Sequence, residues 1–562
     1  PRPVLTAAAL GAWPDQATAP RVITSLRRSA ADHRQITEAV ADAYVLGHLP
    51  EFAAFKHPHA RKVDLPTYPF EHRQYSFRDN QDPDRQQAPQ HLAARTQAVR
   101  LLEDGRIEEL ATLLDGPGSD HQTFDVLTKL AAQHNQQRAT QSIADDRYEI
   151  RWEKAAAPLS GTGAGESIAW ILIADDTDAV QPLVDVLTAG GHRHQILGLP
   201  VSDADEETLA DALRAAAADN SASENNLGNN LRIVHVAAVE SDGAPSMRSL
   251  LRMQHRILSG TQRLFRAAVA AGLRSPIWVV TRGAQRVTES DLVSPDQSCL
   301  WGFGRAAALE LPHVWGGLAD LSNVTPASEA TGNVTPASEA TGNVTPASEW
   351  SQLINVITTR RDSAIGEDQV ALRDQVVYVP RLVRRAEQPS GEPIQLRSPA
   401  TYLVTGGLGS IGLEMAGYLA AHGARQLVLT SRRAPSDAVQ QRIDALSEQH
   451  GCEVRVIAAD VADAHDVARL LAGIAAELPP LAGIVHAAGE IGTTALSNLD
   501  DAEVDRVFAG KVWGAWYLSE AAADLNLDFF LSTSSIASVW GGFGQTAYGA
   551  ANAFLDGLAW RL

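Results

Sequence analysis

From residue 147 onward, short runs of apolar residues alternate with longer segments in which apolar residues recur every three to four positions. The short runs have the length and composition of buried strands, and the longer segments have the periodicity of amphipathic helices. This alternation is typical of a doubly wound parallel sheet and predicts two Rossmann-like α/β arrays. We expect strands at 168–174, 231–238 and 276–281 in the first array, and at 401–405, 426–430, 452–458, 483–486 and 529–533 in the second. Helices of the first array are expected at 206–217 and 247–271.

The first 146 residues follow a different pattern. A strand is predicted at 21–26 and an amphipathic helix at 32–47, and a proline-rich, aromatic segment then indicates an extended linker. Two further helical patterns, at 99–114 and 124–134, are separated by a Gly-Pro-Gly break. These helices either pack on their own domain or pair two copies of the chain, and the pattern leaves both alternatives open.

A decapeptide repeat interrupts the first array. N-V-T-P-A-S-E-A-T-G occurs twice from residue 323, and N-V-T-P-A-S-E then occurs a third time. A period this short, with a proline in every copy, cannot build a solenoid. We therefore expect 323–349 to form an expanded surface loop.

Composition excludes several classes of protein. Of the 562 residues, 45% are hydrophobic, which is enough for several cores, and the net charge of −20 argues against a nucleic acid or an anionic membrane as partner. No apolar run reaches the length of a membrane helix. The two cysteines, Cys299 and Cys452, have neither a disulfide framework nor the spacing of metal ligands. These features fit a reducing compartment and predict no bound metal.

The second array carries a motif for a dinucleotide cofactor. T-G-G-L-G-S-I-G, at 405–412, follows the first strand of that array and opens a helix at 411–421. Glycines there let the backbone turn tightly and approach a pyrophosphate at a helix N-terminus. The equivalent position of the first array holds Asp175-Asp176-Thr177-Asp178, whose charges would repel a pyrophosphate. We therefore predict that only the second array binds the cofactor.

The residues after the second strand predict which dinucleotide binds. Ser431-Arg432-Arg433 stand where enzymes that use NAD usually have a carboxylate for the ribose 2′-hydroxyl. Two arginines can instead neutralise a 2′-phosphate, which favours NADPH, and a solvated basic turn is the alternative. Asp460 can either accept a hydrogen bond from the adenine amino group or cap a helix that begins near Ala462. Small residues in V-H-A-A-G, at 485–489, leave room for the nicotinamide ribose, and His486 is interpreted as structural.

Four polar residues complete the predicted chemistry: Lys511, Ser535, Tyr548 and Asn552. A carbonyl that accepts hydride develops negative charge on its oxygen, and a nearby hydroxyl can stabilise and protonate it. Tyr548 is the expected proton donor, and Lys511 supplies a cation that favours the phenolate. Ser535 can hydrogen-bond the substrate oxygen, and Asn552, on the same helix face as Tyr548, can hold a water of a proton relay.

These motifs closely resemble the ketoreductase domain of modular type I polyketide synthases, whose catalytic part has the short-chain dehydrogenase/reductase fold. R-Y-E-I-R-W at 147–152, W-G-F-G-R-A-A-A-L-E at 301–310 and Y-V-P-R-L at 378–382 resemble its structural subdomain. The resemblance implies that NADPH reduces a β-ketoacyl thioester on an acyl carrier protein to a β-hydroxyacyl thioester, in the bacterial cytoplasm. It also implies ketosynthase and acyltransferase neighbours in the same chain, and a homodimer.

The resemblance also divides the chain into segments. We expect an acyltransferase tail at 1–48, the linker after it at 49–91, a helical linker or dimerisation element at 92–146, the structural subdomain at 147–399 and the catalytic subdomain at 400–562. The chain is expected to come from a longer polypeptide, in which two further strands and a lid helix beyond Leu562 complete the pocket. The alternative is a scaffold segment that serves dimerisation rather than catalysis. The expected cofactor contacts are Thr405, Gly406, Gly407, Leu408, Gly409, Ile411, Ser431, Arg432, Asp460, Val461, Ala487, Ala488, Lys511 and Tyr548.

Stereochemistry follows from the same resemblance. B-type members carry Leu-Asp-Asp shortly after V-H-A-A-G, whereas A-type members have a tryptophan eight residues before the catalytic tyrosine. Here Ile491-Gly492-Thr493 occupies the first position and Trp540 the second, which implies an A-type enzyme that forms the L-hydroxyl. Gln545, where A2-type members have histidine, implies the A1 subtype, and Tyr548 argues against a domain that only epimerises. Leu499-Asp500-Asp501 lies too far along and is interpreted as a helix start.

Overall fold

The computed structural model comprises two compact units, 1–96 and 97–562, of which the second is described far more fully. In the first unit only 39–41 and 43 are described, as helix, within the segment predicted at 32–47. The predicted strand at 21–26 and the linker at 49–91 lie outside the described residues. The second unit is described in short helical stretches between 101 and 135, and then at 146–155, 168–197, 204–220, 231–239, 245–323, 346–359, 367–385 and 395–562, except 176 and 237.

Helical segments occupy the described part of 92–146. Helix α4 (Ile107–Asp115) is a separate element, because Arg106 is not helical and its amide donates to the carbonyl of Leu101 (2.9 Å), five residues back, as at a helix end. The prediction of a single helix at 99–114 is therefore wrong, whereas 126–135 is helical near the predicted bounds. A small buried cluster joins the segments and consists of Leu101, Leu110, Ala111 and Leu127. Pairing of two chains through these helices stays a prediction.

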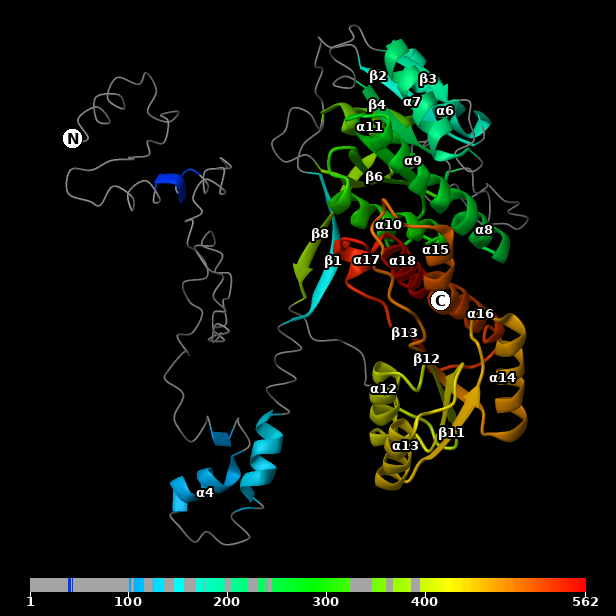
Figure 1. Ribbon diagram of the computed structural model, residues 1–562. Helices are drawn as coiled ribbons and strands as arrows, with labels where there is room; N and C mark the ends of the chain where they lie inside the picture. Colours follow the sequence, from blue (N-terminus) through cyan, green and yellow to red (C-terminus); the bar gives the residue numbers. More distant parts are fainter. Residues whose placement is uncertain are drawn as a thin grey trace, which may run out of the picture. The chain divides into compact units, whose positions relative to one another are not determined.

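The first α/β array is built on an eight-stranded sheet with the order β1-β8-β7-β6-β5-β4-β2-β3 (Figure 1). The strands from β7 to β3 are parallel, but β8 is antiparallel to both β7 and β1. The prediction of a parallel sheet is thus wrong at this edge, because Asp374 and Gln375, both at positive φ, form a two-residue hairpin. The strands are β1 (Tyr148–Lys154), β2 (Ala169–Ile173), β3 (Arg193–Leu197), β4 (Leu231–His235), β5 (Ile277–Arg282), β6 (Trp315–Leu321), β7 (Gln369–Arg373) and β8 (Val376–Arg384).

Helices cover both faces of this sheet (Figure 1). The helix predicted at 247–271 is continuous but contains a π-helical turn, η5 (Met253–Leu258), between α8 (Met247–Arg252) and α9 (Ser259–Ala270). The other helices of the array are α6 (Thr177–Ala189), α7 (Glu206–Asn220), α10 (Pro295–Glu310) and α11 (Pro346–Thr359).

The last part of the decapeptide repeat is helical rather than looped. Helix α11 begins at Pro346, inside the segment 323–349 that was expected to be a loop. Its residue Glu349 is buried and accepts a hydrogen bond from the backbone amide of Ser322 (3.3 Å). The end of the third repeat is therefore part of the packed domain, and residues 324–345 lie outside the described residues.

The second array is a parallel five-stranded sheet with the order β11-β10-β9-β12-β13. All five predicted strands are confirmed, with nearly the predicted bounds: β9 (Thr401–Thr405), β10 (Gln426–Ser431), β11 (Glu453–Ala458), β12 (Leu481–His486) and β13 (Phe529–Ser532). The accompanying helices are α12 (Ser410–Ala421), α13 (Asp437–His450), α14 (Ala464–Glu477), α15 (Asp501–Phe508), η7 (Ala509–Trp513), α16 (Gly514–Ala521), α17 (Ala537–Trp540) and α18 (Thr546–Arg561). Side chains of α12 and α13 pack on one face of the sheet, and those of α14 and α16 on the other.

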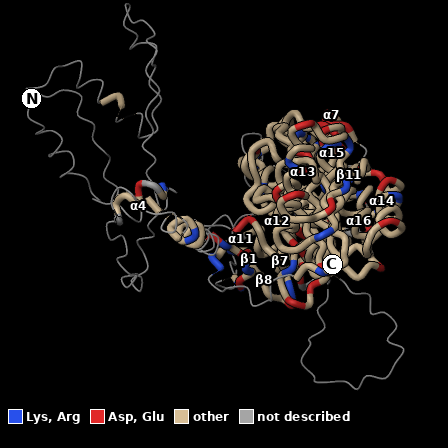
Figure 2. Tube along the Cα trace, turned by 90° about the horizontal axis from the view of Figure 1, so that it is seen from below, with Lys and Arg blue, Asp and Glu red and all other residues tan. Residues whose placement is uncertain are grey.

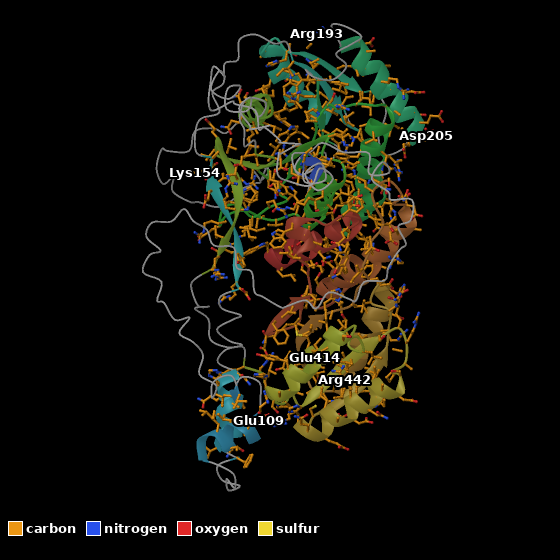
Figure 3. The ribbon with its side chains drawn as sticks, turned by 60° about the vertical axis from the view of Figure 1, so that its left-hand side comes forward. Glu109, Lys154, Arg193, Asp205, Glu414 and Arg442 are labelled. Atoms are coloured by element: carbon orange, nitrogen blue, oxygen red, sulfur yellow. The ribbon has the colours of Figure 1, made fainter. Side chains whose placement is uncertain are left out.

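Charged residues lie mainly on the outside of the two arrays (Figures 2 and 3). Acidic residues occur along α7 and α14. Glu414 of α12 forms an ion pair with Arg442 of α13 at 2.7 Å. Both partners of that pair are more than half exposed, so the pair adds little stability. Among the described helices, none combines the length and the hydropathy that crossing a bilayer requires.

One hydrophobic core joins the two arrays. It contains residues of α7, α9 and α10 from the first array together with residues of α15, η7, α16 and α18 from the second. Helices α10 and α18 touch through their backbones at Gly302 and Gly549. A Cβ on Gly549 would lie 2.7 Å from the carbonyl oxygen of Gly302, a distance that real Cβ atoms essentially never show. The first array is therefore a structural support for α18, the helix that carries Tyr548.

Candidate functional site

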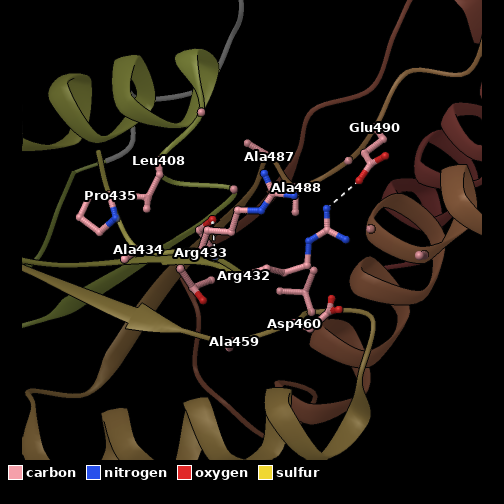
Figure 4. A pocket seen from close by; sticks show the side chains of 18 of the residues that line it. Leu408, Arg432, Arg433, Ala434, Pro435, Ala459, Asp460, Ala487, Ala488 and Glu490 are labelled. Atoms are coloured by element: carbon pink, nitrogen blue, oxygen red, sulfur yellow. Dashed lines mark hydrogen bonds and ion pairs between the residues drawn. The ribbon is translucent and has the colours of Figure 1, made fainter. Parts of the chain in front are cut away.

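A cavity of about 440 Å³ opens at the carboxyl edge of the five-stranded sheet (Figure 4). Residues after β9, β10, β11 and β12 line it, and β9 lies between β10 and β12, where the strand order reverses. Such a switch point is where doubly wound sheets bind their ligands. Nine of the predicted cofactor residues line the cavity, namely Gly406, Leu408, Gly409, Ser431, Arg432, Asp460, Val461, Ala487 and Ala488.

The other five predicted cofactor residues do not line this cavity. Thr405 is buried beneath the turn, Gly407 lies inside the turn, and Ile411 is exposed on α12. Lys511 and Tyr548 belong to a second group of residues, at the end of β13. The predicted set therefore falls into a cofactor cavity and a neighbouring polar cluster.

Three glycines at the turn between β9 and α12, Gly406, Gly407 and Gly412, have no room for a side chain. Gly406 has a φ of +62°, and a Cβ there would lie 2.8 Å from the backbone of Ala487. Cβ atoms on Gly407 and Gly412 would lie 2.8 Å from Val404 O and 2.7 Å from Gly407 Cα. Bare backbone thus faces the cavity directly before the first turn of α12, at Ser410. This arrangement fits the pyrophosphate of a dinucleotide.

An ion pair occupies the mouth of the cavity. Arg432 Nη2 donates to Glu490 Oε1 at 2.6 Å (Figure 4). Arg506 Nη1 donates to the other oxygen of Glu490 at 2.7 Å. Hydrogen bonds from Arg432 and then Arg506 lower the pKa of Glu490. The side chain of Arg432 is 59% exposed, so it can turn toward a phosphate, but Glu490 competes for it. The sequence analysis missed Glu490, although it directly follows V-H-A-A-G.

Asp460 lies in the cavity wall, in a turn of its own. Its Oδ1 accepts from the amide of Ala462 at 3.0 Å. Helix α14 begins two residues later, at Ala464, and Asp463 caps it by accepting from the amides of His465 (2.8 Å) and Asp466 (3.1 Å). The alternative that Asp460 caps this helix is therefore wrong. Asp460 is instead one of the residues that line the cavity.

His486 is a packed residue at the end of β12. Its Nδ1 lies 2.8 Å from Thr405 Oγ1, and the side chain is fully buried. Burial lowers the pKa of His486 to about 4, so the imidazole is neutral at pH 7. This environment supports the structural interpretation of His486.

Lys511 and Tyr548 approach each other at the end of β13. Lys511 lies in the π-helical turn η7, and its Nζ donates to the carbonyl of Thr533 at 2.9 Å. The same Nζ lies 5.3 Å from the centroid of the Tyr548 ring. Burial lowers the pKa of Lys511 to about 8, and the charge of Asp556 partly opposes that shift. A π-helical turn re-aims one side chain of a helix, which is common at functional sites.

Asn552 and Ser535 flank this pair. Asn552 Nδ2 donates to the Tyr548 carbonyl at 2.7 Å, and its buried Oδ1 accepts no hydrogen bond within the described part of the chain. Ser534 Oγ donates to the carbonyl of Asn552 at 3.2 Å, which joins the segment after β13 to α18. Ser535 Oγ accepts from the amide of Ala537 at 3.2 Å, so its own proton can be donated elsewhere.

Two charged residues behind this cluster were missed in the sequence analysis, the partly buried Asp556 and the buried Arg305. Asp556 follows Asn552 by one turn on the same face of α18, and Ser538 Oγ donates to its Oδ2 at 2.5 Å. Arg305 Nη1, from α10, donates to the carbonyl of Ser538, also at 2.5 Å. Burial raises the pKa of Asp556 and lowers that of Arg305 to about 10. Asp556 could have been found in the sequence, because Tyr548, Asn552 and Asp556 are spaced i, i+4, i+8 and therefore share one helix face.

The residues predicted to govern stereochemistry lie beside the polar cluster. Trp540, at the end of α17, is 62% exposed, and Gln545 directly precedes α18. Asp500 caps α15 by accepting from the amide of Glu503 at 2.8 Å, which confirms the interpretation of 499–501 as a helix start. The role of Trp540 and Gln545 in stereocontrol stays a prediction.

Comparison with known proteins supports the same assignment. The family model of the KR domain matches residues 400–562, and the model "Polyketide synthase extender module SpnB, Rossmann fold domain" matches residues 151–382. The chain is 31% identical over 552 residues to polyketide synthase GfsA of Streptomyces halstedii, and the match covers 96% of this chain and 7% of that protein. The chain thus spans a small part of the curated relatives that it matches.

Solved structures agree with the sequence matches. An A-type ketoreductase structure from a modular polyketide synthase is 31% identical, with a TM-score of 0.60, and the alignment covers 75% of this chain and 80% of that one. A C2-type ketoreductase structure is 29% identical, also with a TM-score of 0.60, and covers 74% and 81%. The chain therefore belongs to the ketoreductase domains of modular polyketide synthases.

Proposed function

We propose that this chain uses NADPH to reduce a β-ketoacyl thioester, carried by an acyl carrier protein, to the β-hydroxyacyl thioester. The observation that carries the proposal is the meeting of Lys511, Tyr548 and Asn552 beside a cavity whose turn is bare backbone. Ketoreductase domains are oxidoreductases with a nicotinamide cofactor, which donates hydride to the substrate carbonyl when bound.

In the proposed reaction, Tyr548 donates its hydroxyl proton to the carbonyl oxygen as negative charge develops there. Ser535 donates a second hydrogen bond to the same oxygen, since its hydroxyl accepts from the amide of Ala537 and keeps its own proton free to donate. The Lys511 ammonium, 5.3 Å from the ring centroid, stabilises the phenolate that Tyr548 becomes. Asn552 Oδ1 can accept from a water that returns a proton to Tyr548.

The cofactor preference rests on Arg432 and Arg433, which both line the cavity. Their guanidinium groups suit a 2′-phosphate better than a hydroxyl. Arg432→Ala should raise the Kd of NADPH about 10-fold while that of NADH stays unchanged, because a hydrogen bond to a charged group is lost. The matched control is Arg442→Ala, which removes an exposed arginine of α13. An equal loss of affinity for both cofactors would contradict the assignment of Arg432.

The stereochemical type and the partners are also part of the proposal. Trp540 and the absence of Leu-Asp-Asp at 491–493 support an A-type, A1 product with the L-hydroxyl. The A-type and C2-type structures have the same TM-score to this chain, 0.60, so the product itself must decide the type. The matches to polyketide synthases support ketosynthase, acyltransferase and carrier-protein partners. The homodimer is proposed from the sequence resemblance alone. Chiral analysis of the 3-hydroxyacyl product tests the type, and a D-hydroxyl product would overturn it.

The test of the reaction is NADPH consumption by this chain with a β-ketoacyl N-acetylcysteamine thioester. Tyr548→Phe should lower turnover about 10²–10⁴-fold, the usual contribution of a general acid, with the Kd of NADPH retained. Tyr418→Phe is the matched control, since Tyr418 is an exposed tyrosine of α12. Equal turnover by the parent and Tyr548→Phe would remove Tyr548 from the reaction, and no turnover by the parent would favour a scaffold role.

A further inference from the structure

Glu310, the last residue of α10, links the structural array to two loops of the catalytic array. Its Oε2 accepts from the backbone amide of Leu496 at 2.6 Å. Its Oε1 accepts from the backbone amide of Gly544 at 3.0 Å. The two amides lie 186 and 234 residues away in the sequence. One carboxylate therefore holds two segments that meet only in the folded chain.

These two segments flank the polar cluster of Lys511, Tyr548 and Asn552. The first loop, 487–500, leads from β12 to α15 and includes the stereochemical position 491–493. The second loop, 541–545, joins α17 to α18 and so lies between Trp540 and Tyr548. Both loops present exposed apolar side chains: Ile491 is 63% and Phe543 73% exposed.

The loops also touch each other at the point where Glu310 holds them. Gly544 has a φ of +73°, and a Cβ there would lie 2.8 Å from the carbonyl oxygen of Thr493. Gly541, at the start of the second loop, packs as closely on α10, since its Cβ would lie 2.7 Å from the amide of Ala306. The separation of the loops is thus set by backbone contacts and by the carboxylate, and not by exposed side chains.

We propose that Glu310 is a positioning residue for stereocontrol, whose carboxylate fixes the two loops that orient the ketone. The inference rests on the proposed function, because it concerns the face of the carbonyl that meets the hydride. Two backbone amides need two acceptor atoms, and a carboxylate supplies both. Glutamine has the same size but one acceptor, so its NH₂ group would face an amide donor.

The test compares Glu310→Gln with the parent chain. We expect the KM for the thioester to rise about 10-fold, which is the effect of losing one hydrogen bond to a charged group. The change in kcat should be small. We also expect the share of the minor hydroxyl enantiomer to rise several-fold, while the Kd of NADPH stays unchanged. The amides of Leu496 and Gly544 should exchange with deuterium about 10-fold faster, because their acceptors are weakened.

Ser259→Ala is the matched control. Ser259 Oγ donates to Asp501 Oδ1 at 2.7 Å, so the variant also removes a hydrogen bond between the two arrays, but one that reaches α15 rather than either loop. It should keep the parent's enantiomer ratio and KM. Glu310→Asp, which keeps both acceptors on a shorter side chain, should give an intermediate enantiomer ratio. A parent-like ratio and KM in Glu310→Gln would overturn the proposal, as would equal changes in Ser259→Ala.

Failure of the proposed function can be told apart from failure of this inference. If the parent chain does not reduce the thioester, the proposed function fails on its own. Amide exchange still tests the contact in that case, because it needs no turnover. Unchanged exchange at Leu496 and Gly544 in Glu310→Gln overturns the role of Glu310 whether or not the parent is active.

Discussion

The closest contact between the two arrays yields the sharpest prediction, for the variant Gly302→Ala. A Cβ at this position of α10 would overlap the carbonyl of Gly549 and lie 2.8 Å from the amide nitrogen of Ala550. Ordinary van der Waals contact begins at 3.4 Å, so α18 must move by about 1 Å to admit one methyl group. Neither partner atom can rotate away, because both belong to the backbone of a helix.

This movement should affect turnover more than cofactor binding. Tyr548 directly precedes Gly549, and a misplacement of about 1 Å at a reacting group costs about 10²-fold in rate. Overpacking of a helix contact costs about 1–3 kcal/mol of stability, although alanine is the better helix former by about 1 kcal/mol. The glycine turn and Arg432 line the cavity, whereas no residue of α10 is among its lining residues, so the Kd of NADPH should stay within about 2-fold.

The assay measures kcat with the thioester substrate, the Kd of NADPH and the urea unfolding midpoint. Gly473→Ala is the matched control, because Gly473 lies within α14 and has no atom within 4 Å of an added Cβ. It should raise the free energy of unfolding by about 0.5–1 kcal/mol without changing kcat. A Gly302→Ala variant with parent-like kcat would refute the argument that α10 sets the position of Tyr548.

Three further predictions concern charged groups. The role proposed for Lys511 needs its ammonium form, and burial lowers the pKa of Lys511 to about 8. The value of kcat/KM should therefore be full near pH 7 and fall as the pH rises through about 8, and a profile that is flat to pH 10 would contradict this role. Asp320 is fully buried and accepts a hydrogen bond from buried Arg373 at 2.6 Å. Asp320→Asn should therefore lower the free energy of unfolding, measured in urea, by about 3–5 kcal/mol. A loss below about 1 kcal/mol would show that the remaining partners of Arg373 suffice. Glu490→Gln should lower the Kd of NADPH by up to about 5-fold, because the substitution releases Arg432 from an exposed ion pair. A higher Kd, measured by titration, would mean that Glu490 orients Arg432 instead.

The missed groups show which features a sequence pattern cannot predict. Glu310 and Arg305 were visible only as part of W-G-F-G-R-A-A-A-L-E, and nothing in that segment indicates a partner more than 180 residues away. The antiparallel edge at β8 was missed for a related reason: a strand pattern predicts burial and not direction. Helix α11 was missed because the repeat predicts a loop, whereas Trp350 and its neighbours in that helix are buried in the sheet's core.

Linear sequence patterns were enough to predict the strands of the second array and its candidate site residues. Apolar runs, the glycine turn and the order of Lys511, Ser535 and Tyr548 depend on short-range spacing, which survives in a linear pattern. Only packing in three dimensions places the first array as the support of the candidate site. That support depends on the Gly302–Gly549 contact and on the carboxylate of Glu310, and both form only when helices distant in sequence pack into one core.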